Sequence, residues 1–90
     1  MGIEGALDRA IHAVVPAADV KILLVNSHAT GVVVAKEFDS LTHLDRQKLV
    51  WDRIRRDLGA DAQDVGILFL YTPEEFSAVE EDDHPEGSSA

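Results

Sequence analysis

The chain has no cysteine among its 90 residues. Disulfide bonds, thiol catalysis and metal sites built on thiolates are therefore excluded for this sequence. It also lacks any run of about 18 apolar residues, so we expect no membrane-spanning helix. The opening Met1-Gly2-Ile3-Glu4 has no basic segment before an apolar stretch, which argues against a secretory signal. We expect a cytoplasmic protein.

Positive charge is scarce, because 8 Lys and Arg stand against 17 Asp and Glu, giving a formal net charge of −9. Such a chain should be soluble and repelled overall by phosphate backbones. Five of the eight basic residues fall in one short segment: Arg46, Lys48, Arg53, Arg55 and Arg56. The end of the chain is instead acidic and contains Glu74, Glu75, Glu80, Glu81, Asp82, Asp83 and Glu86. A basic segment therefore lies inside an acidic protein.

The sequence motifs of common enzymes are missing too. There is no Gly-rich phosphate loop, no His-Glu-x-x-His zinc motif and no Gly-x-Ser-x-Gly nucleophile elbow. Ser27 and His28 are neighbours in the sequence, but adjacency alone does not make a catalytic triad. We therefore expect no enzymatic activity and assign no catalytic residue.

Hydrophobic residues make up 46% of the chain, enough for the core of one small domain. An apolar stripe at three- and four-residue spacing predicts a helix over Ile3–Val14, which Pro16 ends. Val20 to Val25 is rich in branched residues and predicts a strand. A polar link at 26–31 leads to a second strand that should end near Phe38. So short a link favours an antiparallel hairpin.

A second amphipathic helix should follow, capped by Thr42 and stopped by Gly59. Its apolar stripe consists of Leu44, Gln47, Val50, Trp51, Ile54 and Leu58. Val65 to Tyr71 is almost continuously apolar, which predicts a strand that is central or covered on both faces. A short last helix runs from Pro73 to about Val79. We therefore expect a domain at 1–79 and an acidic disordered tail at 80–90.

Two signatures about thirty residues apart carry more information than the elements themselves. The first is Glu37-Phe38-Asp39-Ser40-Leu41, followed by Arg46-Gln47 and Val50-Trp51. The second is Tyr71-Thr72-Pro73-Glu74-Glu75-Phe76, in which Thr72 and Glu75 form a capping box around Pro73. Their order and spacing resemble the BolA family from about Ile3 to Phe76. The resemblance implies an α+β fold of order α-β-β-α-β-α, related to class II KH domains, with helices packed on one face of a three-stranded sheet.

The same resemblance implies a function and a site. BolA proteins partner monothiol glutaredoxins and share a [2Fe-2S] cluster with them, using a loop residue between the first two strands and a His beside the third. His28 matches the loop position. The second position falls near Asp64, because no histidine lies between His43 and His84. The chain therefore resembles a divergent member of the family that lacks this His, and a carboxylate is an unusual cluster ligand. His28 is the one candidate metal ligand. The alternative is that His28 is an exposed polar loop residue that binds no metal.

The basic segment supplies the candidate partner-binding residues, Arg46, Arg53, Arg55 and Arg56. A nucleic-acid backbone is one partner they could face. However, Asp45, Asp52 and Asp57 interleave with them, which is typical of a solvated helix with ion pairs. A Gly-x-x-Gly loop in the context that KH domains use is also missing. Nucleic acid is therefore the weaker expectation, and an acidic protein partner is equally compatible with these arginines.

Three functions remain open from the sequence. The favoured one is a BolA-like protein-interaction module, a scaffold or regulatory subunit without metal. The alternative is iron–sulfur handling or stress response with a glutaredoxin through His28. The weaker alternative is a nucleic-acid-binding regulator that uses the basic helix.

Overall fold

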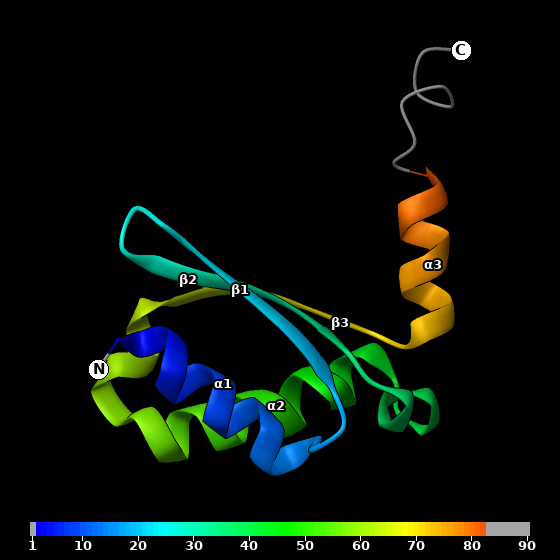
Figure 1. Ribbon diagram of the computed structural model, residues 1–90. Coiled ribbons are helices and arrows are strands. Elements are labelled where there is room, and N and C mark those ends of the chain that lie inside the picture. Colours follow the sequence, from blue (N-terminus) through cyan, green and yellow to red (C-terminus); the bar gives the residue numbers. More distant parts are fainter. Residues whose placement is uncertain (1, 83–90) are drawn as a thin grey trace.

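The computed structural model describes residues 2–82 and shows three helices and a three-stranded sheet (Figure 1). The main elements are α1 (Ile3–Val14), β1 (Asp19–Val25), β2 (His28–Val34), α2 (His43–Leu58), β3 (Val65–Tyr71) and α3 (Pro73–Asp82). Two 3-10 segments, η1 (Lys36–Ser40) and η2 (Gly59–Asp64), flank α2. The predicted α+β class and element order are confirmed. No helix within residues 2–82 is long and apolar enough to cross a membrane.

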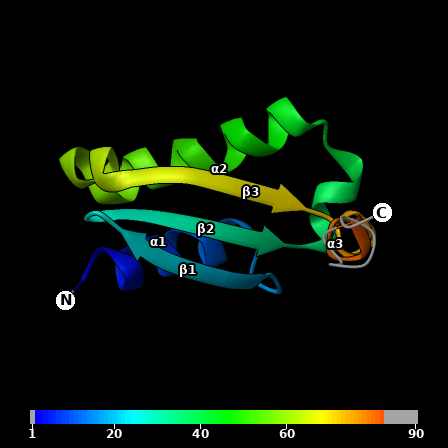
Figure 2. The same cartoon turned by 90° about the horizontal axis from the view of Figure 1, so that it is seen from above.

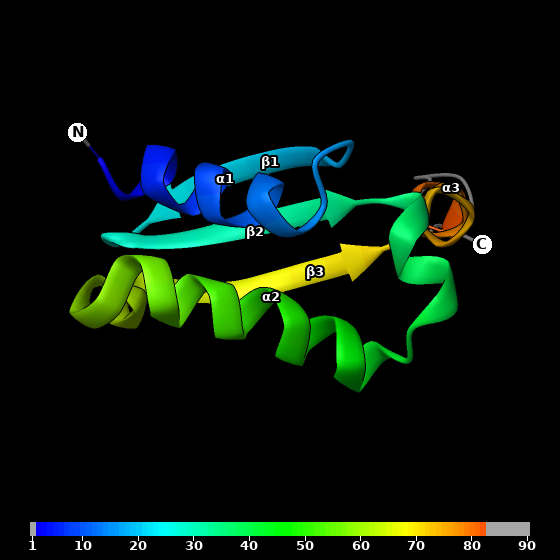
Figure 3. The same cartoon turned by 90° about the horizontal axis from the view of Figure 1, so that it is seen from below.

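Helices α1 and α2 lie side by side on one face of the sheet (Figure 3). Seen from the other side, the opposite face carries no helix, and α3 is viewed end-on at one end of the sheet (Figure 2). We call this uncovered surface the outer face. Helix α3 rises from the end of β3 on the side of the outer face, away from α1 and α2 (Figure 1).

The strand order is β1-β2-β3, so β2 is the central strand. Strands β1 and β2 pair antiparallel, with Val25 opposite His28, as the hairpin prediction required. Strands β2 and β3 pair in parallel, with Val34 opposite Tyr71. The prediction that Val65–Tyr71 is central or covered on both faces was wrong, because β3 lies at the edge with one face open. A nearly continuous apolar run is typical of a strand that is covered on both faces, but only one face of β3 is buried.

The hairpin link is shorter than predicted. Asn26 and Ser27 form it alone, and their φ values of 51° and 68° suit a tight turn with two left-handed residues. The polar residues from His28 onward belong to β2 instead. Gly31 lies inside that strand, and a Cβ at this position would lie only 3.1 Å from Leu68 Cδ2 on β3. Glycine is therefore present because the two strands pack closely here, and not because the segment is a loop, as its polar residues suggested.

The second strand also ends earlier than predicted, at Val34. η1 then turns the chain and buries Phe38 completely in the core. The predicted cap of α2 is confirmed, since the Asp45 backbone N–H donates to Thr42 Oγ1 at 3.1 Å. Gly59, at φ 58°, follows the last residue of α2 as predicted. Trp51 is half-buried and packs against the core, as the helix stripe predicted.

The core lies between the sheet and the α1–α2 layer. It joins Leu7, Ala10, Ile11, Val15, Ala29, Val33, Phe38, Val50, Ile54, Val65, Leu68 and Leu70. Helix α3 continues to Asp82, three residues beyond the predicted end near Val79. The prediction of a disordered tail at 80–90 was therefore wrong for residues 80–82, which are helical, and the rest of that tail lies outside the described residues.

Candidate functional site

Arg46 is a buried charged residue, only 4% exposed. Its Nε donates to the carbonyl oxygens of Phe38 and Leu41, at 3.0 and 3.1 Å. Its Nη1 donates to the carbonyl of Leu70 at 3.2 Å and to Glu75 Oε1 at 2.6 Å. The prediction that Arg46 binds a partner was therefore wrong. Its guanidinium is fully engaged in joining η1, α2, β3 and α3.

Glu75 completes this joint from the side of α3. The Glu75 backbone N–H donates to Thr72 Oγ1 at 3.2 Å, and Glu75 Oε1 accepts from the Thr72 N–H at 2.8 Å. The predicted capping box is thus confirmed. The hydrogen bond from Arg46, supported by the one from Thr72, lowers the pKa of Glu75 from 4.5 to about 2. The ionised carboxylate therefore fixes the base of α3 at the end of the sheet.

This lowered pKa gives a pH-dependent stability. A carboxylate whose folded pKa is depressed stabilises the fold above its unfolded pKa of 4.5, and this contribution disappears as the pH falls toward about 2. We expect Glu75→Gln to lose stability relative to the native chain at pH 7, and the difference to shrink between pH 4.5 and pH 2. Urea denaturation of both chains across this range measures it. A difference that stays constant with pH would contradict the assignment.

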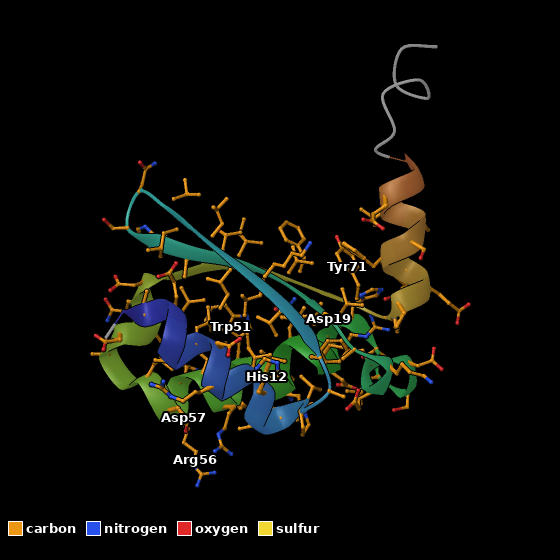
Figure 4. All side chains as sticks on the ribbon, in the orientation of Figure 1. His12, Asp19, Trp51, Arg56, Asp57 and Tyr71 are labelled. Atoms are coloured by element: carbon orange, nitrogen blue, oxygen red, sulfur yellow. The ribbon has the colours of Figure 1, made fainter. Side chains whose placement is uncertain are left out.

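The remaining arginines of α2 are exposed or half-exposed. Arg53 Nε pairs with Asp57 at 2.9 Å, and Arg55 Nη2 pairs with Asp52 at 3.2 Å, as expected for a solvated helix with ion pairs. Arg56 extends outward beside Asp57, away from the sheet (Figure 4). The acidic neighbours therefore neutralise much of the positive charge on this helix surface.

His28 lies exposed at the first position of β2, and its Nδ1 donates to the Asn26 carbonyl at 3.1 Å. This bond leaves Nε2 as the free ring nitrogen. The start of β3 is adjacent, since a Cβ on Gly66 would lie 3.8 Å from His28 Cβ. Asp64 directly precedes that strand. The fold thus brings together the two regions that the resemblance implied.

The donor set there does not suit an iron–sulfur cluster. It offers one imidazole, from His28, and a hard carboxylate, from Asp64, where cysteine thiolates or imidazoles are the usual ligands. Within residues 2–82, no group of three or more His, Cys, Asp or Glu side chains could hold a metal ion.

His12, near the end of α1, forms a local set of contacts. Its Nε2 lies 3.0 Å from the Ala18 carbonyl, and its Nδ1 lies 3.1 Å from the Asp8 carbonyl and 3.3 Å from Asp8 Oδ2. Because all three partners are acceptors, the protonated ring with two N–H donors fits best. The Ala18 hydrogen bond is the largest cause that raises the pKa of His12 above 6.5. Protonated His12 thereby ties the end of α1 to the chain entering β1.

A group whose folded pKa is raised stabilises the fold below its unfolded pKa and loses that contribution as the pH rises through the folded value. We expect His12→Ala to be less stable than the native chain at pH 5.5, with the difference shrinking toward pH 9. Urea denaturation at several pH values measures it. Asp8→Asn supplies a control, because it should weaken the pH dependence while keeping the ring. A difference that grows with pH would contradict the contact.

The largest unexplained feature is the outer face of the sheet. The register places the apolar side chains of all three strands there, namely Leu23, Val25, Val32, Val34, Ile67, Phe69 and Tyr71. Leu23 is 66% exposed and Ile67 63% exposed, and Phe69 is 42% exposed. Phe69 stacks on Tyr71 with ring centroids 6.3 Å apart. Apolar strand residues are usually covered, so their pattern in the sequence does not reveal that this face is open.

Helix α3 bounds the outer face at one end. Phe76 on α3 lies beside Tyr71, with ring centroids 6.0 Å apart. A groove of about 240 Å³ opens at this corner, lined by Asp19, Val20, Lys21, Val32, Val34 and Phe76. Figure 4 shows Tyr71 beside α3 and Asp19 near its foot. The outer face and α3 thus form an L-shaped surface with an apolar floor.

Comparison with known proteins supports the fold and its family. No protein-family model and no curated protein matches the sequence. A BolA protein homologue from Coxiella burnetii superposes with a TM-score of 0.59, at 26% identity over 86% of this chain and 99% of the other. A bol-like protein from Babesia bovis has a TM-score of 0.51 at 17% identity, over 84% and 91% of the two chains, and supports the fold alone. The chain is thus BolA-like in its fold and in the order of its two signature segments.

Proposed function

We propose that this chain is a non-enzymatic protein-interaction module, a scaffold or regulatory subunit whose partner covers the outer face of the sheet. The observation that supports it most is the exposure of Leu23, Ile67 and Phe69 on the same face of the sheet. Large side chains scattered singly over a surface are ordinary, whereas a contiguous patch on a small protein marks a binding site.

A pair of leucines with almost equal exposure allows a matched test. Leu23 on the outer face is 66% exposed, and Leu44 on α2 is 70% exposed. Each would be changed to glutamate in a tagged chain and used to capture partners from the cytoplasm of the source organism, with quantitative mass spectrometry. We expect one or more partners to be retained by Leu44→Glu and lost from Leu23→Glu. Equal capture by the two variants would contradict the use of the outer face.

Iron–sulfur handling with a monothiol glutaredoxin through His28 remains the alternative. It is supported by the exposed His28 Nε2 and by the adjacent start of β3, but not by Asp64. The test mixes the chain with a monothiol glutaredoxin that carries its [2Fe-2S] cluster and follows visible circular dichroism. A new spectrum that disappears in His28→Ala would favour this alternative. An unchanged spectrum would favour the metal-free module.

The nucleic-acid alternative has less support. Of the four arginines considered, Arg46 is buried, and Arg53 and Arg55 are paired with aspartates. A basic footprint on one face is the usual requirement for nucleic-acid binding, and the net charge of −9 opposes it.

A further inference from the structure

We infer that the partner presents an amphipathic, basic helix, which lies on the outer face of the sheet against α3. This inference rests on the proposed function and specifies the chemistry of the partner. Two properties of the surface define that chemistry, the apolar floor on the sheet and the acidic character of the bounding helix.

The floor requires an apolar cover. Along the parallel pair, Val32 lies opposite Phe69 and Val34 opposite Tyr71, and all four side chains belong to the outer face. The inner positions of β3, Leu68 and Leu70, are already buried against α2 and the core. Strand β3 therefore has the sequence of a strand covered on both sides, while only one side is covered within the chain. A partner supplies the missing layer.

The dimensions suit one helix. Strands of seven residues are about 23 Å long, and three strands spaced about 4.8 Å apart make a narrow floor. A helix with its side chains is about 10–12 Å across, and about 15 residues of helix span 23 Å. Helix α3 stands at one end of the floor as a wall.

The wall is acidic. Helix α3 has no lysine or arginine, and its Glu74 and Glu80 are exposed, whereas Glu75 is paired with Arg46. Val79 and Glu80 lie one turn further along the side of α3 that carries Phe76, above the groove. Asp19 adds a carboxylate at the foot of the wall, next to a single cation, Lys21. Lysines or arginines flanking the apolar stripe of a partner helix would match this arrangement.

A second copy of this chain fits less well. Two sheets pack face to face about 10 Å apart, whereas α3 rises about 15 Å above the outer face over its ten residues. Face-to-face pairing would also confront two acidic helices of a chain whose net charge is −9. Self-association therefore enters as an outcome of the test.

The test uses two synthetic amphipathic peptides of 18 residues with the same leucine stripe, one flanked by lysines and one by glutamates. Binding to the ¹⁵N-labelled chain is followed by NMR, and affinity by fluorescence anisotropy. We expect the lysine peptide to bind with shifts confined to β1–β3 and α3, and the glutamate peptide not to bind. Leu23→Glu should weaken binding at least about tenfold, because it places a charge under the apolar stripe. Leu44→Glu should leave it unchanged.

The acidic wall is tested separately with Glu80→Lys, matched by Asp61→Lys, an equal charge reversal at an exposed position on η2. Glu80→Lys should weaken the lysine peptide about two- to fivefold at low salt, and the effect should fall as salt rises. Asp61→Lys should have a smaller effect. Equal effects of the two reversals, or shifts on α2, would overturn the inference.

The failures of the two proposals can be told apart. If neither peptide binds, but cellular partners are still lost from Leu23→Glu alone, the interaction module stands and the basic helix is wrong. If Leu23→Glu and Leu44→Glu behave alike in both assays, both proposals fail. Concentration-dependent dimerisation that Leu23→Glu abolishes and Leu44→Glu does not would replace the partner helix with a second copy.

Discussion

Arg46→Ala is expected to destabilise the fold by about 3–5 kcal/mol, the cost of removing one partner from a buried charged network. The substitution leaves the carbonyl oxygen of Leu70 without its Arg46 donor and removes the bidentate partner of Glu75. The Phe38 carbonyl loses one of its two donors and keeps the Leu41 backbone N–H. A buried acceptor without a partner retains its desolvation penalty. For a domain of this size, about 1 kcal/mol corresponds to about 4–8 °C in Tm, so a loss well above 10 °C should be seen.

Arg53→Ala is the matched control, because it removes the same side chain from the same helix. Arg53 makes one exposed ion pair with Asp57, which should contribute less than about 1 kcal/mol. Arg46→Lys is a second variant, and it should recover only part of the stability because an ammonium cannot reproduce the planar fork. Thermal unfolding by circular dichroism compares the three. Similar losses for Arg46→Ala and Arg53→Ala would show that the buried network contributes little.

Phe38→Ala should cost about 3–5 kcal/mol, as large-to-small changes of a buried aromatic do. Phe38 is completely buried, so the deleted ring leaves a cavity in the core beside η1. The Arg46 guanidinium also lies 5.7 Å from the ring centroid, and that contact is lost. Phe38→Leu should cost less, because leucine fills most of the volume.

Phe69→Ala provides the control for this deletion. Its ring lies on the outer face and is 42% exposed, so its removal should cost much less than that of Phe38. Urea denaturation at neutral pH gives both free energies of unfolding. A loss for Phe69→Ala as large as that for Phe38→Ala would indicate that the outer face is covered within the isolated chain, and would count against the proposed interaction surface.

The local signals of the sequence were reliable where short-range chemistry decides the structure. The caps at Thr42 and Thr72, the stop at Gly59 and the helix stripe with Trp51 depend on residues within one or two turns of each other. The α-β-β-α-β-α order followed from these signals together with the family resemblance. The predicted boundaries of the strands were less accurate where polar residues suggested a loop. His28, for example, was placed in the link at 26–31 but is the first residue of β2.

The sequence by itself therefore determined the elements, their order, the hairpin and the resemblance to the BolA family. The tertiary structure alone decided how Arg46 is used, because its acceptors at Leu70 and Glu75 are 24 and 29 residues away in the chain. It also decided that β3 lies at an edge with Ile67 and Phe69 open to solvent. Strand order and the side on which helices pack depend on contacts between segments that are distant in the chain. An apolar run indicates which residues need to be covered, but it does not indicate which part of the molecule covers them.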